Sequence, residues 1–169
     1  MTPADKNAAH SAPARPGKSW AKRFWRAFWI AFLAASLAYA WYSFYAPAND
    51  VAWADDLDAA RSAAVAADRP MMLFFTASWC SPCRIMKREV FADGAVARAI
   101  NAGVVPVMIH AEEPGADAVF EHYQVGGTPV TIFTDPQGAV IDYGVGRMAK
   151  AEFLAMLGGL DARRAASSP

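Results

Sequence analysis

The sequence has few of the residues that bind metals or crosslink a chain. Its 169 residues include two cysteines, Cys80 and Cys83, and three histidines. A closed zinc site needs four ligands, and no second cysteine pair accompanies the first. The spacing of His110 and His122 matches no common zinc-binding pattern. We therefore expect no metal site, and we interpret the two histidines as a strand residue and a helix-surface residue.

The chain also lacks net charge, because 16 lysines and arginines balance 16 aspartates and glutamates. A balanced total offers no basic surface for nucleic acid, so we expect no nucleic-acid partner. The charges are unevenly spread: one acidic residue precedes Ala27, against the basic residues Lys6, Arg15, Lys18, Lys22, Arg23 and Arg26. Basic segments beside a membrane span stay in the cytoplasm. The N-terminal end is therefore expected there, and the rest of the chain outside.

Charge is absent altogether from residues 27–46, which read AFWIAFLAASLAYAWYSFYA. About 20 apolar residues, rising about 1.5 Å each, cross a hydrocarbon core of about 30 Å. Aromatic rings favour the headgroup region, and they lie near both ends of this segment: Trp20, Phe24, Trp25, Trp41, Tyr42 and Tyr45. We predict a transmembrane signal anchor over residues 27–46, preceded by a disordered basic cytoplasmic tail over residues 1–26.

Two other interpretations of the apolar segment stay open. Ala38-Tyr39-Ala40 resembles a small-x-small cleavage site, so the segment could be a signal peptide that is removed. It could also be a buried core helix. Bulky aromatic residues continue past Ala40, which favours an uncleaved anchor. We expect a single-pass protein of a bacterial inner membrane with its domain in the periplasm, or alternatively a periplasmic protein after cleavage.

The exported part has no internal repeat or low-complexity block. We expect a linker over residues 47–54 and one globular domain over residues 55–164. Helical spacing of apolar residues and short β-branched or apolar runs predict its elements. The order is a helix ending before Pro70, strand 71–77, helices 80–91 and 95–101, strand 104–109, helix 116–123, strands 130–134 and 139–145, and helix 150–160. This order predicts an α/β fold in which helices cover both faces of a central mixed sheet.

Cys80 and Cys83 lie two residues apart at the junction of a predicted strand and helix. Thiol-disulfide exchange needs an attacking thiolate and a second thiol that displaces the mixed disulfide. Free N-H groups and the helix dipole in a first helical turn would stabilise a thiolate, so Cys80 is the expected nucleophile. Cys83 faces the same side of the helix and is the expected resolving thiol, and Pro82 suits the first turn.

This chemistry needs no bound cofactor beyond a redox-active Cys80–Cys83 disulfide. Two alternatives for the pair are an inert stabilising disulfide and half of a zinc site. The first is disfavoured because closing so short a loop removes little entropy from the unfolded chain. The second is disfavoured by the missing ligands.

Two motifs resemble those of the thioredoxin family over roughly residues 51–160. Trp79-Cys80-Ser81-Pro82-Cys83 is similar to the family's active-site sequence, and Gly127-Thr128-Pro129 before a strand is similar to its cis-proline loop. Within the family, the resemblance is closest to the thioredoxin-like C-terminal domains of the DsbD family of transmembrane disulfide reductases. The resemblance implies a thioredoxin fold in which Trp79, Ser81 and Pro82 surround the cysteines, with Trp79 shielding Cys80. It also implies that Thr128 and Pro129 contact an extended substrate segment by strand addition.

One position departs from the family pattern. The family often has a buried acid six residues before the nucleophile, which assists deprotonation of the resolving thiol, and here that position is Phe74. Water or a neighbouring acid such as Glu89 could replace it. Glu89 is more simply interpreted as a solvated helix residue.

Together, the residues and the resemblance predict a membrane-anchored, periplasm-facing thiol-disulfide oxidoreductase that reduces or relays protein disulfides. Expected partners are protein thiols and disulfides and a transmembrane electron donor, near which the anchor would concentrate the domain. A thiol oxidase of the same fold is an alternative, favoured by unusually strong thiolate stabilisation. A thioredoxin-like copper-binding assembly factor is disfavoured, since such factors use a Cys-x-x-x-Cys pair. A redox-inactive adhesion or chaperone module would not need both cysteines.

Overall fold

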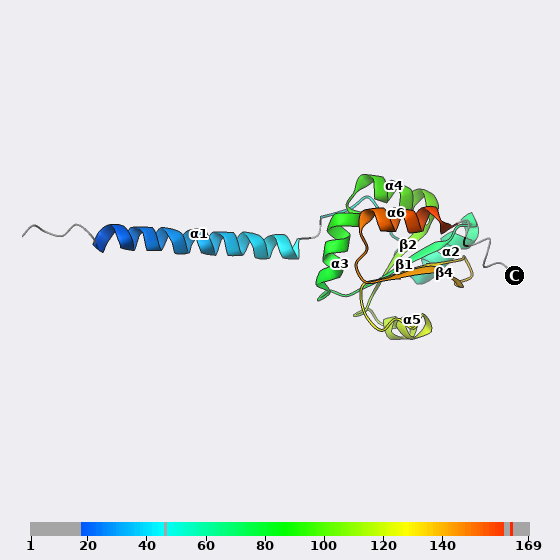
Figure 1. The fold of residues 1–169 in the computed structure, drawn as a ribbon. Coiled ribbons are helices and arrows are strands. Elements are labelled where there is room, and N and C mark those ends of the chain that lie inside the picture. The colour runs from blue at the N-terminus through cyan, green and yellow to red at the C-terminus, as the bar shows by residue number, and fades with distance from the viewer. Residues whose placement is uncertain (1–17, 46, 161–162, 164–169) are drawn as a thin grey trace, which may run out of the picture. The chain divides into compact units, whose positions relative to one another are not determined.

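The computed structural model describes residues 18–45, 47–160 and 163. Residues 1–17 of the predicted tail and the C-terminal end of the predicted domain lie outside these ranges. The chain divides into two compact units, with the boundary between Trp41 and Tyr42. Each unit is described by itself below (Figure 1).

Helix α1 spans Lys18–Phe44. Its segment Trp20–Phe44 is long and apolar enough to cross a membrane, with a mean hydropathy of 1.4. The helix begins earlier than the predicted anchor, so residues 18–26, which were expected in the disordered tail, are helical. The reason is that no proline or glycine interrupts the sequence between Gly17 and Phe44. Large apolar side chains of α1 are exposed, which is contrary to the alternative of a buried core helix.

The domain follows the predicted order of elements. They are α2 (Leu57–Ala67), β1 (Met71–Thr76), α3 (Ser81–Met86), the π-helical turn η1 (Lys87–Phe91), α4 (Gly94–Gly103), β2 (Val105–His110), α5 (Ala116–His122), β3 (Val130–Thr134), β4 (Val140–Val145) and α6 (Lys150–Gly158). The strands form one sheet in the order β2-β1-β3-β4. β1 is parallel to β2 and antiparallel to β3, and β3 is antiparallel to β4. The predicted mixed sheet is confirmed.

Helices cover both faces of the sheet, as predicted. Met72 and Phe74 of β1 point to the face that packs against α3, η1, α4 and α6, whereas Leu73 and Phe75 point to the face that packs against α2 and α5. In Figure 1, α5 lies on the opposite side of the sheet from α4 and α6. Every residue of β1 is buried, which explains why this strand reads as a continuous apolar run.

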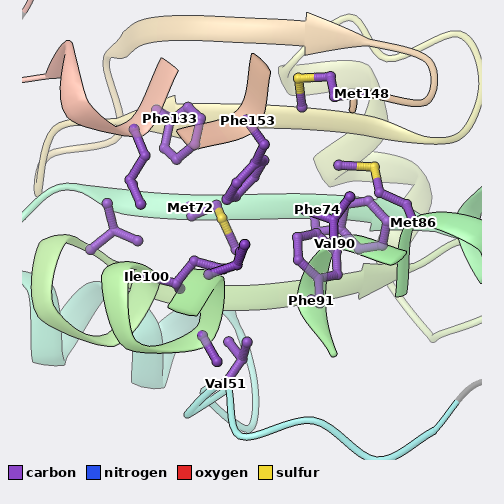
Figure 2. Close-up of a cluster of buried hydrophobic side chains, with 14 of the residues drawn as sticks. Val51, Met72, Phe74, Met86, Val90, Phe91, Ile100, Phe133, Met148 and Phe153 are labelled. Atoms are coloured by element: carbon purple, nitrogen blue, oxygen red, sulfur yellow. The ribbon is translucent and has the colours of Figure 1, made fainter. Parts of the chain in front are cut away.

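An aromatic cluster fills the first of these faces (Figure 2). The Phe74 and Phe91 rings meet edge to face with centroids 4.9 Å apart, and Phe91 meets Phe153 in the same way at 5.6 Å. All three side chains are fully buried. This packing ties β1, which precedes the cysteine pair, to η1, which follows it, and to α6.

Two features of the domain differ from the prediction. The predicted helix 80–91 changes to a π-helical turn at Lys87, where the Ala92 amide donates to the Lys87 carbonyl at 3.0 Å. The wider turn lets the adjacent residues Val90 and Phe91 both enter the core.

The predicted linker, residues 47–54, is the second difference. Val51 is buried, and Ala54 forms a bridge with Val107 of β2. The Asn101 side chain also accepts a hydrogen bond from the Ala52 amide at 2.9 Å. The end of this segment is therefore packed as part of the domain, because Val51 has apolar surface to bury.

Candidate active site

Cys80 occupies the N-cap position of α3, directly after the turn that leaves β1. The Cys83 amide donates a hydrogen bond to the Cys80 sulfur at 3.1 Å. The two cysteines form a disulfide, with their Cα atoms 5.3 Å apart. An N-H group aimed at the Cys80 sulfur would stabilise a thiolate there in the reduced form, which is the chemistry expected of the nucleophile.

The neighbours of the pair differ in their exposure. Both cysteines are buried in the disulfide form, and Trp79 beside them is 70% exposed. Trp79 therefore presents an apolar ring to solvent next to Cys80. Ser81 and Pro82 lie in the first turn of α3, where both are exposed.

The Thr128-Pro129 peptide bond is cis. β3 begins at the next residue, Val130, which pairs with Phe75 near the end of β1. Cys80 follows that same end of β1, so the cis-proline loop and the cysteine pair lie at one end of the sheet. The Pro129 carbonyl accepts a hydrogen bond from the Gly146 amide at 2.8 Å, which fastens the loop to the residue after β4.

A groove of about 700 Å³ runs from the cis-proline loop along β4. Its wall includes Thr128 and Pro129, and Tyr143 and Val145 of β4. The two β4 side chains are 63% and 74% exposed. An edge strand with exposed apolar side chains beside the loop is suited to hold an extended apolar segment of another protein.

The structure also places at this end a carboxylate that the sequence did not reveal. Glu112 accepts hydrogen bonds from both the amide and the hydroxyl of Ser78, each at 2.8 Å. The hydrogen bond from the Ser78 amide is the larger cause, and that from the Ser78 hydroxyl is the next, of a pKa of Glu112 that lies below its usual value. Ser78 precedes Cys80 by two residues, so Glu112 holds the turn that leads into the cysteine pair. One feature of the sequence could have indicated this position of Glu112. The residue closely follows β2, and the carboxyl end of β2 lies beside that of the parallel strand β1.

Two basic side chains complete this region. Arg84 donates hydrogen bonds to the Ser78 carbonyl and the Ser81 hydroxyl, both at 2.9 Å. Lys87 is partly buried, and burial lowers its pKa while the charge of Glu112 acts in the opposite direction. The turn from Ser78 to Ser81 is thus held by Glu112, in the turn after β2, and by Arg84 of α3.

The position of the absent family acid is apolar in the structure. Phe74 is fully buried against Phe91, with no exposed surface. Glu89 is half exposed and pairs with Arg147 at 3.2 Å and with Arg88 at 3.7 Å, as expected for a solvated helix residue. Among the described residues, no group of three or more histidine, cysteine, aspartate or glutamate side chains is placed to hold a metal ion.

Residues 57–160 match the family model of a thioredoxin-like domain. The match covers more than half of the chain. Among curated relatives, the thiol:disulfide interchange protein DsbD of Ralstonia nicotianae is 41% identical over 105 residues, which are 60% of this chain and 17% of that protein. The chain thus spans about a sixth of the length of this relative.

Solved structures agree on the fold. A thioredoxin from Thermus thermophilus matches 68% of this chain and 89% of its own, with a TM-score of 0.61 and 26% identity. The oxidised C-terminal domain of DsbD from Neisseria meningitidis matches 61% of this chain and 90% of its own, with a TM-score of 0.53 and 21% identity. The predicted thioredoxin fold is confirmed.

Proposed function

We propose, because this chain belongs to the thioredoxin-like domain family, that it is a membrane-anchored thiol-disulfide oxidoreductase that reduces or relays protein disulfides in the periplasm. The observation that carries this proposal is the placement of Cys80 at the N-cap of α3, with the Cys83 amide donating to its sulfur. The name of the Ralstonia relative, a thiol:disulfide interchange protein, supports the same chemistry.

The reaction needs only the two thiols and a partner disulfide. The Cys80 thiolate attacks one sulfur of the partner, forming a mixed disulfide and releasing the partner's other sulfur as a thiolate. The Cys83 thiolate then attacks the Cys80 sulfur, which forms the disulfide seen here and releases the partner's second thiolate. Two electrons pass to the partner, and protons from the two cysteines end on its thiolates. A donor dithiol restores the reduced pair by the reverse steps.

The partner segment is proposed to lie against the cis-proline loop. Thr128 and Pro129 would pair with its extended backbone, and Trp79 would contact it beside the scissile disulfide. The exposed apolar side chains of Tyr143 and Val145 extend this contact surface along the groove. Such a surface favours a segment with apolar residues near its cysteine.

Anchoring through the segment 27–46 places the domain near membrane partners, among them a transmembrane electron donor. Helix α1 supports this part of the proposal by its length and hydropathy. The basic residues before Ala27 support a cytoplasmic N-terminus and a periplasmic domain.

The equilibrium reduction potential of the Cys80–Cys83 pair tests the proposed function. Full-length protein in detergent is equilibrated in glutathione or dithiothreitol redox buffers, and its free thiols are trapped and counted. A value near about −270 mV supports a reductase, whereas a value near about −120 mV supports the alternative of a thiol oxidase. A pair that equilibrates with neither buffer would contradict the redox function.

Single cysteine variants assign the two roles. Cys83→Ser is expected to accumulate the mixed disulfide with a partner, because nothing resolves it, whereas Cys80→Ser is expected to form none. Gel mobility under non-reducing conditions after acid trapping measures both. Accumulation in Cys80→Ser instead would exchange the assigned roles.

A further inference from the structure

The resolving thiol has to ionise in apolar surroundings. Cys83 is 1% exposed and belongs to the same hydrophobic cluster as Phe74, Met86 and Phe91. Figure 2 shows the side chains of these three neighbours. A thiolate in such a place is strongly disfavoured unless hydrogen bonds meet its charge. Phe74, which occupies the position six residues before Cys80, has no group that can do so.

Two threonines lie on this same face of the sheet, next to Phe74. Thr131 of β3 is the direct cross-strand partner of Phe74, and Thr76 follows Phe74 by two residues on β1. Side chains alternate along a strand, so Thr76 points to the same face as Phe74, and Thr131 points to the same face as Phe133. Phe74 and Phe133 both belong to the cluster that contains Cys83.

The hydroxyls of Thr76 and Thr131 are fully buried, and neither has a hydrogen-bond partner within the described part of the chain. A buried hydroxyl without a partner is unfavourable, and native proteins contain few of them. On the face that carries the resolving cysteine, two such hydroxyls are available to donate to an acceptor that forms there during the reaction. A thiolate is such an acceptor, whereas the sulfur of a disulfide is a weak one.

We propose that the hydroxyls of Thr76 and Thr131 donate hydrogen bonds to the Cys83 sulfur when it ionises, and so position and stabilise the resolving thiolate. The inference rests on the proposed function. It explains how Cys83 becomes a thiolate before it attacks the Cys80 sulfur of the mixed disulfide. Thr76 and Thr131 take the part that an acid at position 74 would otherwise take. They cannot titrate in the working pH range, so Cys83 must pass its proton to solvent or to the departing partner.

β3 offers a matched control. Thr134 is also fully buried, and its hydroxyl likewise has no partner within the described residues. It pairs with Met71, which belongs to the cluster on the opposite face of the sheet. Thr134→Val therefore removes the same atom from the same strand, but away from Cys83.

The test follows reduced full-length protein in detergent as it reacts with the small disulfide 5,5′-dithiobis(2-nitrobenzoate) in a stopped-flow instrument across a range of pH. Attack by Cys80 releases one coloured thiolate, and resolution by Cys83 releases the second. In Thr131→Val and Thr76→Val we expect the first phase to keep its wild-type rate and pH profile, which shows that the surroundings of Cys80 at the start of α3 are retained. The second phase is expected to slow about tenfold at low pH, with the midpoint of its pH profile raised by about one unit. At high pH its rate should return to the wild-type value.

The outcomes separate this inference from the proposed function. If the wild-type protein gives no second release, the proposed function fails and the inference with it. If the wild type gives both phases and the pH profiles of Thr131→Val and Thr76→Val superimpose on its own, only the inference is overturned. Equal slowing in Thr134→Val would also overturn it, because the effect would then come from packing on either face.

Discussion

At the scale of single residues, Glu112 is the side chain whose ionisation most directly fixes the turn before Cys80. Its pKa lies below the ordinary value of 4.5, because the Ser78 amide and hydroxyl bond to the charged form. A lowered carboxyl pKa contributes stability that is fully present above pH 4.5 and is lost as pH falls through the folded-state pKa. Glu112→Gln removes this contribution. The difference in unfolding free energy between wild type and Glu112→Gln should therefore be constant above pH 4.5 and shrink below it, as measured by urea denaturation.

The neighbouring carboxylate provides the comparison for that experiment. Glu113→Gln removes the same charge one residue along the chain and leaves both Ser78 hydrogen bonds in place. If its pH profile matched that of Glu112→Gln, the effect would be one of net charge and the Ser78 bonds would not explain it.

Sequence and structure differ in what they reveal about single residues. The spacing of Cys80 and Cys83, and their place after an apolar strand, were sufficient to find the disulfide. The contact between Ser78 and Glu112 joins residues 34 positions apart, and no local sequence pattern indicates it. The hydroxyls of Thr76 and Thr131, which have no partner among the residues that the structure describes, were equally hidden. Threonine is common in strands, and only the strand register shows which face each one occupies.

At the scale of elements, the start of α2 depends on one side chain. The Asp56 carboxylate accepts a hydrogen bond from the Ala59 amide at 2.7 Å, which satisfies a donor that the helix leaves free. Asp56→Ala should lower the free energy of unfolding by about 1 kcal/mol, measured by urea denaturation at neutral pH. Asp55→Ala, at the preceding residue, should change it by less than about 0.5 kcal/mol. Equal losses in the two variants would show that charge, and not capping, stabilises this end of α2.

Most elements of the domain were predictable because their apolar periods are clear. β3 has the predicted bounds, and β1 differs from the prediction only by ending at Thr76. The π-helical turn η1 was not predicted, since it depends on the packing of Val90 and Phe91 against residues that are distant in sequence, such as Phe153. The docking of Val51 was missed for a similar reason: Val51 and Trp53 are the two large apolar residues of a short stretch, which is too short to show a helical or strand period.

At the scale of the whole molecule, orientation in the membrane is the property that the proposed function needs most. We expect a membrane-impermeant maleimide, applied to reduced cells whose outer membrane has been permeabilised, to label the nucleophile Cys80. A cysteine introduced by Ser11→Cys, in a chain that lacks the two native cysteines, should stay unlabelled until the inner membrane is broken. Labelling of the Ser11→Cys chain in intact cells would contradict the proposed orientation. If the domain were found in the soluble fraction after lysis and not in the membrane fraction, that result would contradict an uncleaved anchor.

The two edges of the sheet are not equivalent. At the β2 edge, Ala54 of the chain itself already pairs with Val107, whereas β4 is the last strand on the other side. A second copy that added its own β4 antiparallel to this one would use the free edge of both molecules at once. The bridge at Ala54 obstructs the corresponding addition at the β2 edge, so the sheet favours strand addition at β4 over extension in both directions.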